Sequence, residues 1–416
     1  MQNPQSTFPI DWIRDQFPSL KNTINNQQIH YLDGPAGTQV PRKVMNAIID
    51  YLTNTNANDG GYFHNSRSTE TIVTKVRNKT ANFLGAKSPH EISFGANMTS
   101  LTFTLSRALA RNWQPGDQII LTDLDHDANF STWQQAANDK GVTIKTWQCD
   151  PSTGHLDIDQ LTSLINQKTK LIAFTLASNT LGTLINPKPI ISLARQYGTL
   201  VFADAVHYAP HFPLQVAEWD VDFLACSPYK FYGPHLGILY GKKTLKEQIS
   251  PYKVSAAADD LPNKWETGTP SFEAICGLGA CLDYLYELGS RENQNLSFQE
   301  GLKSAMDKTE KYEATLTNKF FEKAETIKGL KIYGPPPGTR KTPTFSFTLK
   351  GFHPDFIAEH LAKYGISCWS GHLYAKNLIK AMGLEESGGL VRVGCSQYTS
   401  ESDLDAFWSA LEHIHH

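Results

Sequence analysis

Short runs of apolar residues alternate with amphipathic stretches from about residue 90 to residue 241. The runs are almost continuously apolar, which is typical of strands buried on both faces of a parallel sheet that helices cover. The expected strands are 91–94, 118–122, 143–148, 171–176, 200–204, 222–226 and 237–241. The expected helices are 99–112, 157–166, 187–197 and 272–288. This alternation predicts an α/β fold with a mostly parallel, seven-stranded sheet.

A smaller α+β pattern follows a polar stretch of helical character at 290–329. Its expected strands are 344–349 and 390–395, and its expected helices are 354–364 and 400–414, the last one capped by Ser400 or Ser402. We therefore expect three parts in the chain. They are an N-terminal segment (1–30) that packs with the small domain, a large domain (31–290) and a small C-terminal domain (291–416).

Charge and cysteine content exclude several classes of protein. The 416 residues carry 38 Lys and Arg against 41 Asp and Glu, and nonspecific binding to nucleic acid or anionic membrane needs a basic surface instead. No apolar stretch approaches the ~18 residues of a membrane span, and the N-terminus lacks the pattern of a secretory signal, so we expect a cytoplasmic protein. None of the six cysteines forms a CxxC pair, which argues against a zinc ribbon or a thioredoxin-type motif.

Two charged residues lie at the ends of expected strands. Burial at the end of 222–226 would lower the pKa of Lys230 and make it a candidate for Schiff-base formation, although an ordinary lysine reaching water is the alternative. Asp204 ends the strand 200–204, where ligands bind in α/β sheets. It could hold a pyridinium nitrogen or join His207 and His211 in a metal site. Two nearby prolines make a regular helix there improbable, so we expect no metal.

Three further segments carry candidate chemistry. The loop 95–100, GANMTS, joins a strand to a helix and would direct backbone N–H groups at an anion. In the segment 123–129, DLDHDAN, His126 could bind a metal with the carboxylates, stack on a planar cofactor, or cap a turn. Arg392 lies in an apolar strand, where a bidentate contact to a carboxylate or a structural ion pair would satisfy it.

Each signal is weak alone, but their order along the chain strongly resembles the class V aminotransferase family of pyridoxal-phosphate enzymes. Within that family, the chain looks most like the cysteine desulfurases and their desulfurase-like relatives. The resemblance runs from YLDGPAGTQVP (31–41) to about residue 410. It implies a fold-type I transferase fold, pyridoxal 5′-phosphate as cofactor, a small amino-acid substrate, and a homodimer with shared active sites.

The resemblance also implies catalytic roles. Lys230 matches the lysine that forms the Schiff base and then moves the α-proton. Asp204 matches the acid that keeps the pyridine nitrogen protonated, and His126 matches the histidine that stacks on the ring. Arg392 matches the residue that binds the substrate carboxylate.

The remaining residues match positions that hold the cofactor. Asn179 matches an asparagine that contacts the ring hydroxyl, and His207 stands near the ring oxygen. The phosphate contacts fall on Asn97, Met98, Ser227 and, from the neighbouring subunit, Thr269.

The sequence departs from the family at three places. SPYK replaces the usual SGHK, which puts Tyr229 before the lysine, and Asn97 stands where threonine is common. The third departure bears on the reaction. The most similar desulfurases read RTGHHC, and that cysteine attacks the substrate sulfur, whereas this chain reads WSGHLY (369–374) and has Tyr374 at the aligned position.

We therefore expect elimination of a β-substituent through C–S cleavage, or transamination, with Tyr374 near the substrate. One alternative is a persulfide-forming cysteine desulfurase that uses another thiol, Cys368 or Cys395. A regulatory protein that binds the cofactor without turnover is a third possibility. It should have lost Lys230, Asp204 or Arg392, and all three are present.

Overall fold

The structure is a computed structural model that describes residues 8–24 and 26–415, so the first seven residues of the expected N-terminal segment lie outside the described residues. Seven strands form the main sheet in the order β4-β10-β9-β8-β7-β5-β6. Their bounds are β4 (Ile92–Gly95), β5 (Gln118–Thr122), β6 (Thr143–Trp147), β7 (Thr169–Thr175), β8 (Leu200–Asp204), β9 (Phe223–Cys226) and β10 (Gly237–Gly241). Strands β5 to β9 pair in parallel, and β10 is antiparallel to both neighbours. The expected mostly parallel, seven-stranded α/β fold is confirmed.

Both faces of this sheet are covered, as the apolar runs predict. In β5, Ile119 and Leu121 pack under α4 (Met98–Ala110) and α5 (Ser131–Lys140), whereas Ile120 joins the core on the opposite face. Helices α6 (Ile158–Leu164) and α7 (Pro187–Gln196) cover the opposite face, together with three longer helices. Strand β6 is the exception, because it ends the sheet and leaves Thr143, Lys145 and Thr146 exposed.

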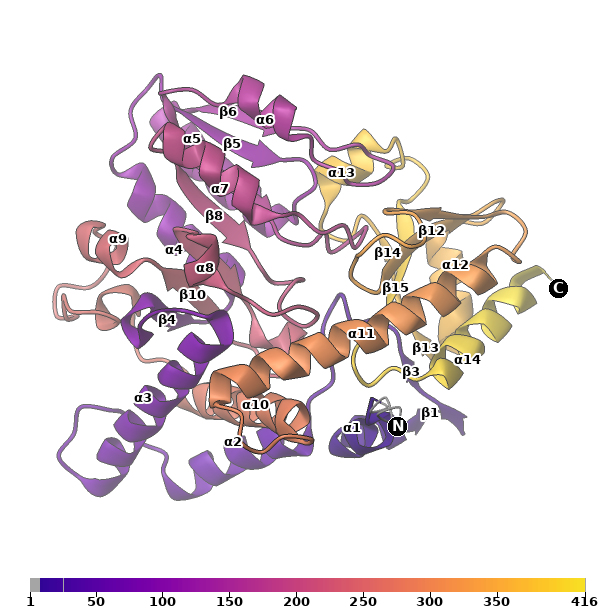
Figure 1. The fold of residues 1–416 in the computed structure, drawn as a ribbon, viewed down its shortest axis with the longest axis horizontal. Helices are drawn as coiled ribbons and strands as arrows, with labels where there is room; N and C mark the ends of the chain where they lie inside the picture. The colour runs from indigo at the N-terminus through magenta and orange to yellow at the C-terminus, as the bar shows by residue number, and fades with distance from the viewer. Residues whose placement is uncertain (1–7, 25, 416) are drawn as a thin grey trace, which may run out of the picture.

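Helices α2 (Arg42–Asn54), α3 (His64–Leu84) and α10 (Phe272–Ser290) pack together below the sheet in Figure 1. Together with the main sheet they form what we call the large lobe. The short helices α8 (Val216–Trp219) and α9 (Lys243–Gln248) lie in its connections. From α10 the chain enters α11 (Phe298–Ala324), which runs across to the other end of the molecule (Figure 1).

The small lobe is a four-stranded antiparallel sheet in the order β11-β12-β15-β14, against which two helices of its own and the C-terminal part of α11 pack. Its strands are β11 (Leu330–Tyr333), β12 (Thr344–Leu349), β14 (Trp369–Gly371) and β15 (Leu390–Gly394), and its helices are α12 (Pro354–Lys363) and α14 (Glu401–Glu412). Ser400 caps α14 and forms a capping box with Asp403, which decides between the two capping candidates. The sequence patterns missed β11 and β14, which are only four and three residues long.

The N-terminal segment contacts both lobes. Helix α1 (Ile10–Gln16) carries Arg14, which pairs with Asp403 at 2.8 Å, and β3 (His30–Tyr31) pairs in parallel with β13 (Ile366–Ser367). Phe17 packs against tyrosines of the large lobe as well. The division into 1–30, 31–290 and 291–416 therefore stays a proposal. Among the described residues, no helix is long and apolar enough to cross a membrane.

Candidate functional site

A pocket opens where β7, β8 and β9 reach their carboxyl ends, the place where open α/β sheets bind ligands. Most of the predicted site residues line it: Asn97, Met98, His126, Asn179, Asp204, His207, Ser227 and Lys230. Arg392 and Tyr374 lie outside the lining but contact residues that belong to it. Thr269 is exposed and lines a separate hollow beside Gly95 and Ser100.

Lys230 is buried in the short turn that follows β9. Its Nζ donates a hydrogen bond to the backbone oxygen of Pro35. Burial lowers the pKa of Lys230 to about 7, and the nearby Arg392 guanidinium acts in the same direction. The amine is therefore neutral in a large fraction of molecules near neutral pH, as a nucleophile or a base requires. The alternative of a lysine reaching water is wrong.

Asp204 and His207 lie at the end of β8. Burial raises the pKa of Asp204 to about 6, although its Oδ1 accepts a hydrogen bond from the backbone of Val206 at 2.8 Å. Burial also lowers the pKa of His207 well below its usual range. The Nε2 edge of His207 lies 2.8 Å from the hydroxyl of Thr344 in the small lobe.

His126 begins the short turn that follows β5. Its Nδ1 accepts a hydrogen bond from the backbone of Ala128 at 3.0 Å, so it caps a turn as one of the alternatives required. The same ring lines the pocket. Burial lowers the pKa of His126 to about 4, which keeps the imidazole neutral. The Nδ1 atom of His126 thus caps the turn, and the ring as a whole lines the pocket.

The part of the pocket lined by Asn97, Met98 and Ser227 is suited to an anion. Helix α4 begins at Met98 after its cap Asn97, whose Oδ1 accepts from Ser100 N at 2.8 Å. The N–H of Met98 points to Ser227 Oγ at 3.1 Å. Gly237 lets this turn approach β10, because a Cβ there would lie 2.5 Å from the backbone carbon of Asn97. The positive end of the helix dipole at this N-terminus favours a phosphate.

Arg392 is 5% exposed and comes from the middle of β15. Its guanidinium donates to the backbone oxygen of Asn179 at 2.9 Å, and burial lowers the pKa of Arg392 to about 10. No carboxylate of the described residues forms an ion pair with it. The structural ion pair is therefore not formed within the described residues, although the Asp33 carboxylate raises the pKa of Arg392 against the effect of burial.

The pocket also offers polar atoms to a ligand. Within the described residues, Asn179 Oδ1 and His207 Nδ1 are buried and have no hydrogen-bond partner. Buried polar atoms are rarely left in this state unless a water or a ligand completes them. These groups together fit pyridoxal 5′-phosphate. The Lys230 amine suits its aldehyde, and the Asp204 carboxyl group suits its ring nitrogen. The two unpartnered atoms suit its ring oxygen, and the helix N-terminus suits its phosphate.

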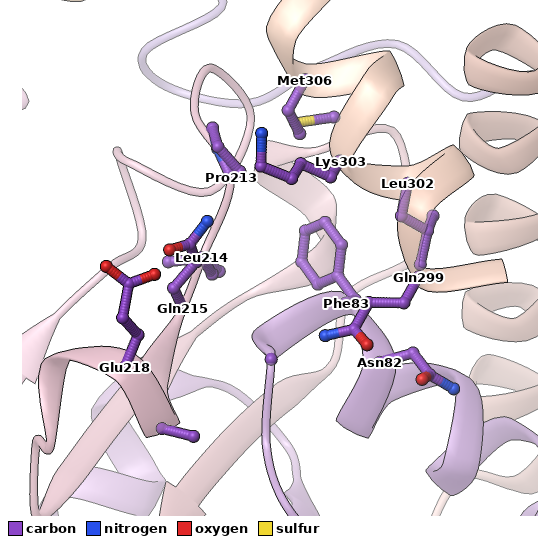
Figure 2. A pocket seen from close by; sticks show the side chains of 12 residues that line it. Asn82, Phe83, Pro213, Leu214, Gln215, Glu218, Gln299, Leu302, Lys303 and Met306 are labelled. Atoms are coloured by element: carbon purple, nitrogen blue, oxygen red, sulfur yellow. The ribbon is translucent and has the colours of Figure 1, made fainter. Parts of the chain in front are cut away.

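Sequence reasoning missed several lining residues, among them Thr175, Val206 and Tyr229. All three adjoin a strand end or a predicted site residue, and that position was the available signal. Size alone does not identify the site, because several hollows elsewhere on the molecule are larger than this pocket. A hollow of about 330 Å³ lies between the end of α3, the loop before α8 and the start of α11 (Figure 2), and it contains none of the predicted residues.

Known proteins resemble the chain over nearly its whole length. The Aminotransferase class-V family matches residues 30–407. A cysteine desulfurase of Yersinia pestis is 32% identical over 424 residues, covering 98% of each protein. The apo structure of a cysteine desulfurase from Thermococcus onnurineus NA1 has a TM-score of 0.87 at 25% identity, covering 98% of each chain. A C-DES mutant with glycine covalently linked to its PLP cofactor shares the fold at 18% identity and a TM-score of 0.79, covering 96% of this chain and 98% of the other.

Proposed function

We propose that this chain, which belongs to the class V aminotransferase family of pyridoxal-phosphate enzymes, eliminates a β-substituent from a small α-amino acid. The observation that carries the proposal is the absence of a thiol from the pocket. Among the described residues, no cysteine lines it, and the loop position of the attacking cysteine holds Tyr374. Cleavage of a C–S bond then has to release the sulfur directly.

The residues support a division of labour around the cofactor. When bound, pyridoxal phosphate supplies an electron sink that stabilises negative charge at the α-carbon of an amino acid. Asn97, Met98 and Ser227 would hold its phosphate, and Thr269 would reach the phosphate in the partner subunit. Asn179 and His207 would contact the ring oxygen.

Four residues would carry the reaction. Arg392 would bind the substrate carboxylate and orient the α-carbon. The Lys230 amine, with its pKa lowered to about 7, would take the α-proton and deliver a proton again later. Asp204 would hold a proton at the ring nitrogen, and His126 would cover one face of the ring and exclude water from it.

A second reaction has its own support, because the similar proteins are named cysteine desulfurases. That reaction needs a thiolate, the nucleophilic form of cysteine. Burial raises the pKa of Cys368 to about 12 and the pKa of Cys395 well above its usual range. Both thiols are therefore poor candidates, and elimination is the better reading. Transamination shares the early proton transfer and differs in its products.

Incubating the holoenzyme with L-cysteine separates these reactions. Elimination yields sulfide, ammonia and pyruvate, and a Cys368→Ser variant should turn over at the same rate as the original protein. Alkylation of the protein during turnover, followed by mass spectrometry, should detect no persulfide. Alanine formed at the rate of a persulfide on Cys368 or Cys395 would overturn the proposal. A keto acid that accumulates with aminated cofactor would establish transamination.

A further inference from the structure

The ring of Tyr374 stacks on the ring of His126, across the boundary between the two lobes. The ring centroids lie 5.3 Å apart and the planes differ by 14°. Tyr374 is 62% exposed, so burial of its own side chain does not explain the placement. His126 has only two faces, and Tyr374 covers one of them. The other face is left to whatever planar group fills the pocket.

The backbone around Tyr374 is held by the large lobe as well. Asn179 Nδ2 donates to the oxygen of Leu373 at 2.9 Å, and the N–H of Asp127 donates to the oxygen of Tyr374 at 2.6 Å. Leu373 and Tyr374 have φ angles of 54° and 56°, a left-handed conformation that residues other than glycine seldom adopt. Such a conformation persists where surrounding contacts determine it, and it is frequent at functional sites.

We propose that Tyr374 is a positioning residue that holds His126 against the planar group in the pocket. The segment 371–375, here called the latch, presents it. The latch is docked by the stacked ring and by two hydrogen bonds that its backbone oxygens accept, one from the backbone of Asp127 and one from the side chain of Asn179. Asn179 also accepts the Arg392 hydrogen bond, so the latch adjoins both the cofactor residues and the carboxylate site. The inference rests on the proposed function only for the identity of the planar group.

This arrangement gives the loop a different task from the one a cysteine would have there. A thiol that collects sulfur must swing toward the substrate, whereas Tyr374 is useful only while it stays in place. The edge of the His126 ring is already fixed through the Ala128 hydrogen bond. Tyr374 restrains the ring by stacking on one of its faces, and the hydrogen bond at the edge of the ring cannot supply that restraint.

Two measurements on Tyr374→Ala and Tyr374→Phe test the proposal. The first is amide hydrogen exchange at Asp127 in the cofactor-free protein, which needs neither substrate nor activity. It should accelerate at least tenfold in Tyr374→Ala and stay unchanged in Tyr374→Phe, which keeps the ring. The second is the rate at which pyridoxal phosphate leaves the holoenzyme, which should rise at least threefold in Tyr374→Ala alone.

Tyr364→Ala is the matched control, because Tyr364 is 39% exposed, lies in the small lobe and has its ring 5.0 Å from that of His360. It should change neither rate. Unchanged rates in Tyr374→Ala would overturn the proposal, and so would faster exchange without faster cofactor release, since the latch would then not position His126. Equal acceleration of amide exchange and cofactor release in Tyr374→Phe would also overturn the proposal. The products formed from L-cysteine test the proposed function separately, so either result can fail alone.

Discussion

Replacing Arg392 by methionine separates ligand binding from packing. The side chain is buried, its guanidinium donates to Asn179 O, and no carboxylate of the described chain is paired with it. Methionine fills a similar volume without charge. If Arg392 binds the carboxylate of a substrate, Arg392→Met should weaken amino-acid binding and leave the fold intact.

Binding a substrate carboxylate and forming a structural ion pair predict effects of different size. A hydrogen bond to a charged group contributes about 1.5–3 kcal/mol, and about 1.4 kcal/mol is a factor of ten in affinity. The dissociation constant of a carboxylate-bearing amino acid should therefore rise by about 10- to 150-fold. Breaking a buried ion pair would instead cost about 3–5 kcal/mol of stability. No such pair is formed by the described residues, and only the weaker attraction to Asp33 is lost, so Arg392→Met should change the free energy of unfolding by clearly less.

The assay follows the visible absorbance of the holoenzyme during titration with amino acid, with denaturant unfolding measured in parallel. Arg340→Met is the control, because Arg340 lies at the surface and pairs with Glu310 at 2.6 Å. It should leave the dissociation constant unchanged. An unchanged constant in Arg392→Met would refute the reasoning. A stability loss of about 3–5 kcal/mol with unchanged affinity would show a structural ion pair instead.

Two further predictions concern the cofactor. Because burial lowers the pKa of Lys230 to about 7, the neutral amine predominates above that pH, so pyridoxal phosphate should attach to the cofactor-free protein at a rate that rises to about pH 7 and then levels. Borohydride reduction should then label Lys230. A rate still rising at about pH 9, as for an ordinary lysine, or label on another lysine, would contradict the assignment. Because Thr269 is exposed outside the pocket of its own chain, mixing Lys230→Ala and Thr269→Ala subunits should restore part of the activity through hybrids with one intact site. Subunit exchange without recovery would exclude shared sites.

The fold was predictable where burial acts on every residue of a segment. Strands β5, β8 and β10 have the bounds expected from their apolar runs, because all or nearly all of their residues are buried. Strand β6 also formed where expected, but it is mostly exposed. Its place at the edge of the sheet follows from strand order, which no local pattern encodes.

Sequence patterns likewise predicted part of the site, namely its residues but not all of its contacts. Strand ends and the loops after them give Asp204, Ser227 and Lys230, since the carboxyl ends of parallel strands meet at one edge of a sheet. The contact between Arg392 and Asn179 joins residues 213 positions apart, and it depends on how the two lobes pack. The stacking of Tyr374 on His126 depends on the same packing. Sequence patterns therefore named these residues without giving their partners.

Similarity of the whole chain and identity of the reaction are separate questions here, and Cys368 shows why. A thiol that takes sulfur from a substrate must reach it, and it must ionise first. Cys368 lies between Ser367, which pairs with Tyr31, and Trp369, which pairs with Arg392, so both neighbours are fixed in strands. Burial raises its pKa to about 12 as well. Presenting this thiol would mean separating β13 or β14 from its partner, whereas a loop cysteine at position 374 would need only an undocked latch. The likeness to cysteine desulfurases therefore supports the cofactor, and under the proposed function the loop at position 374 decides where the sulfur goes.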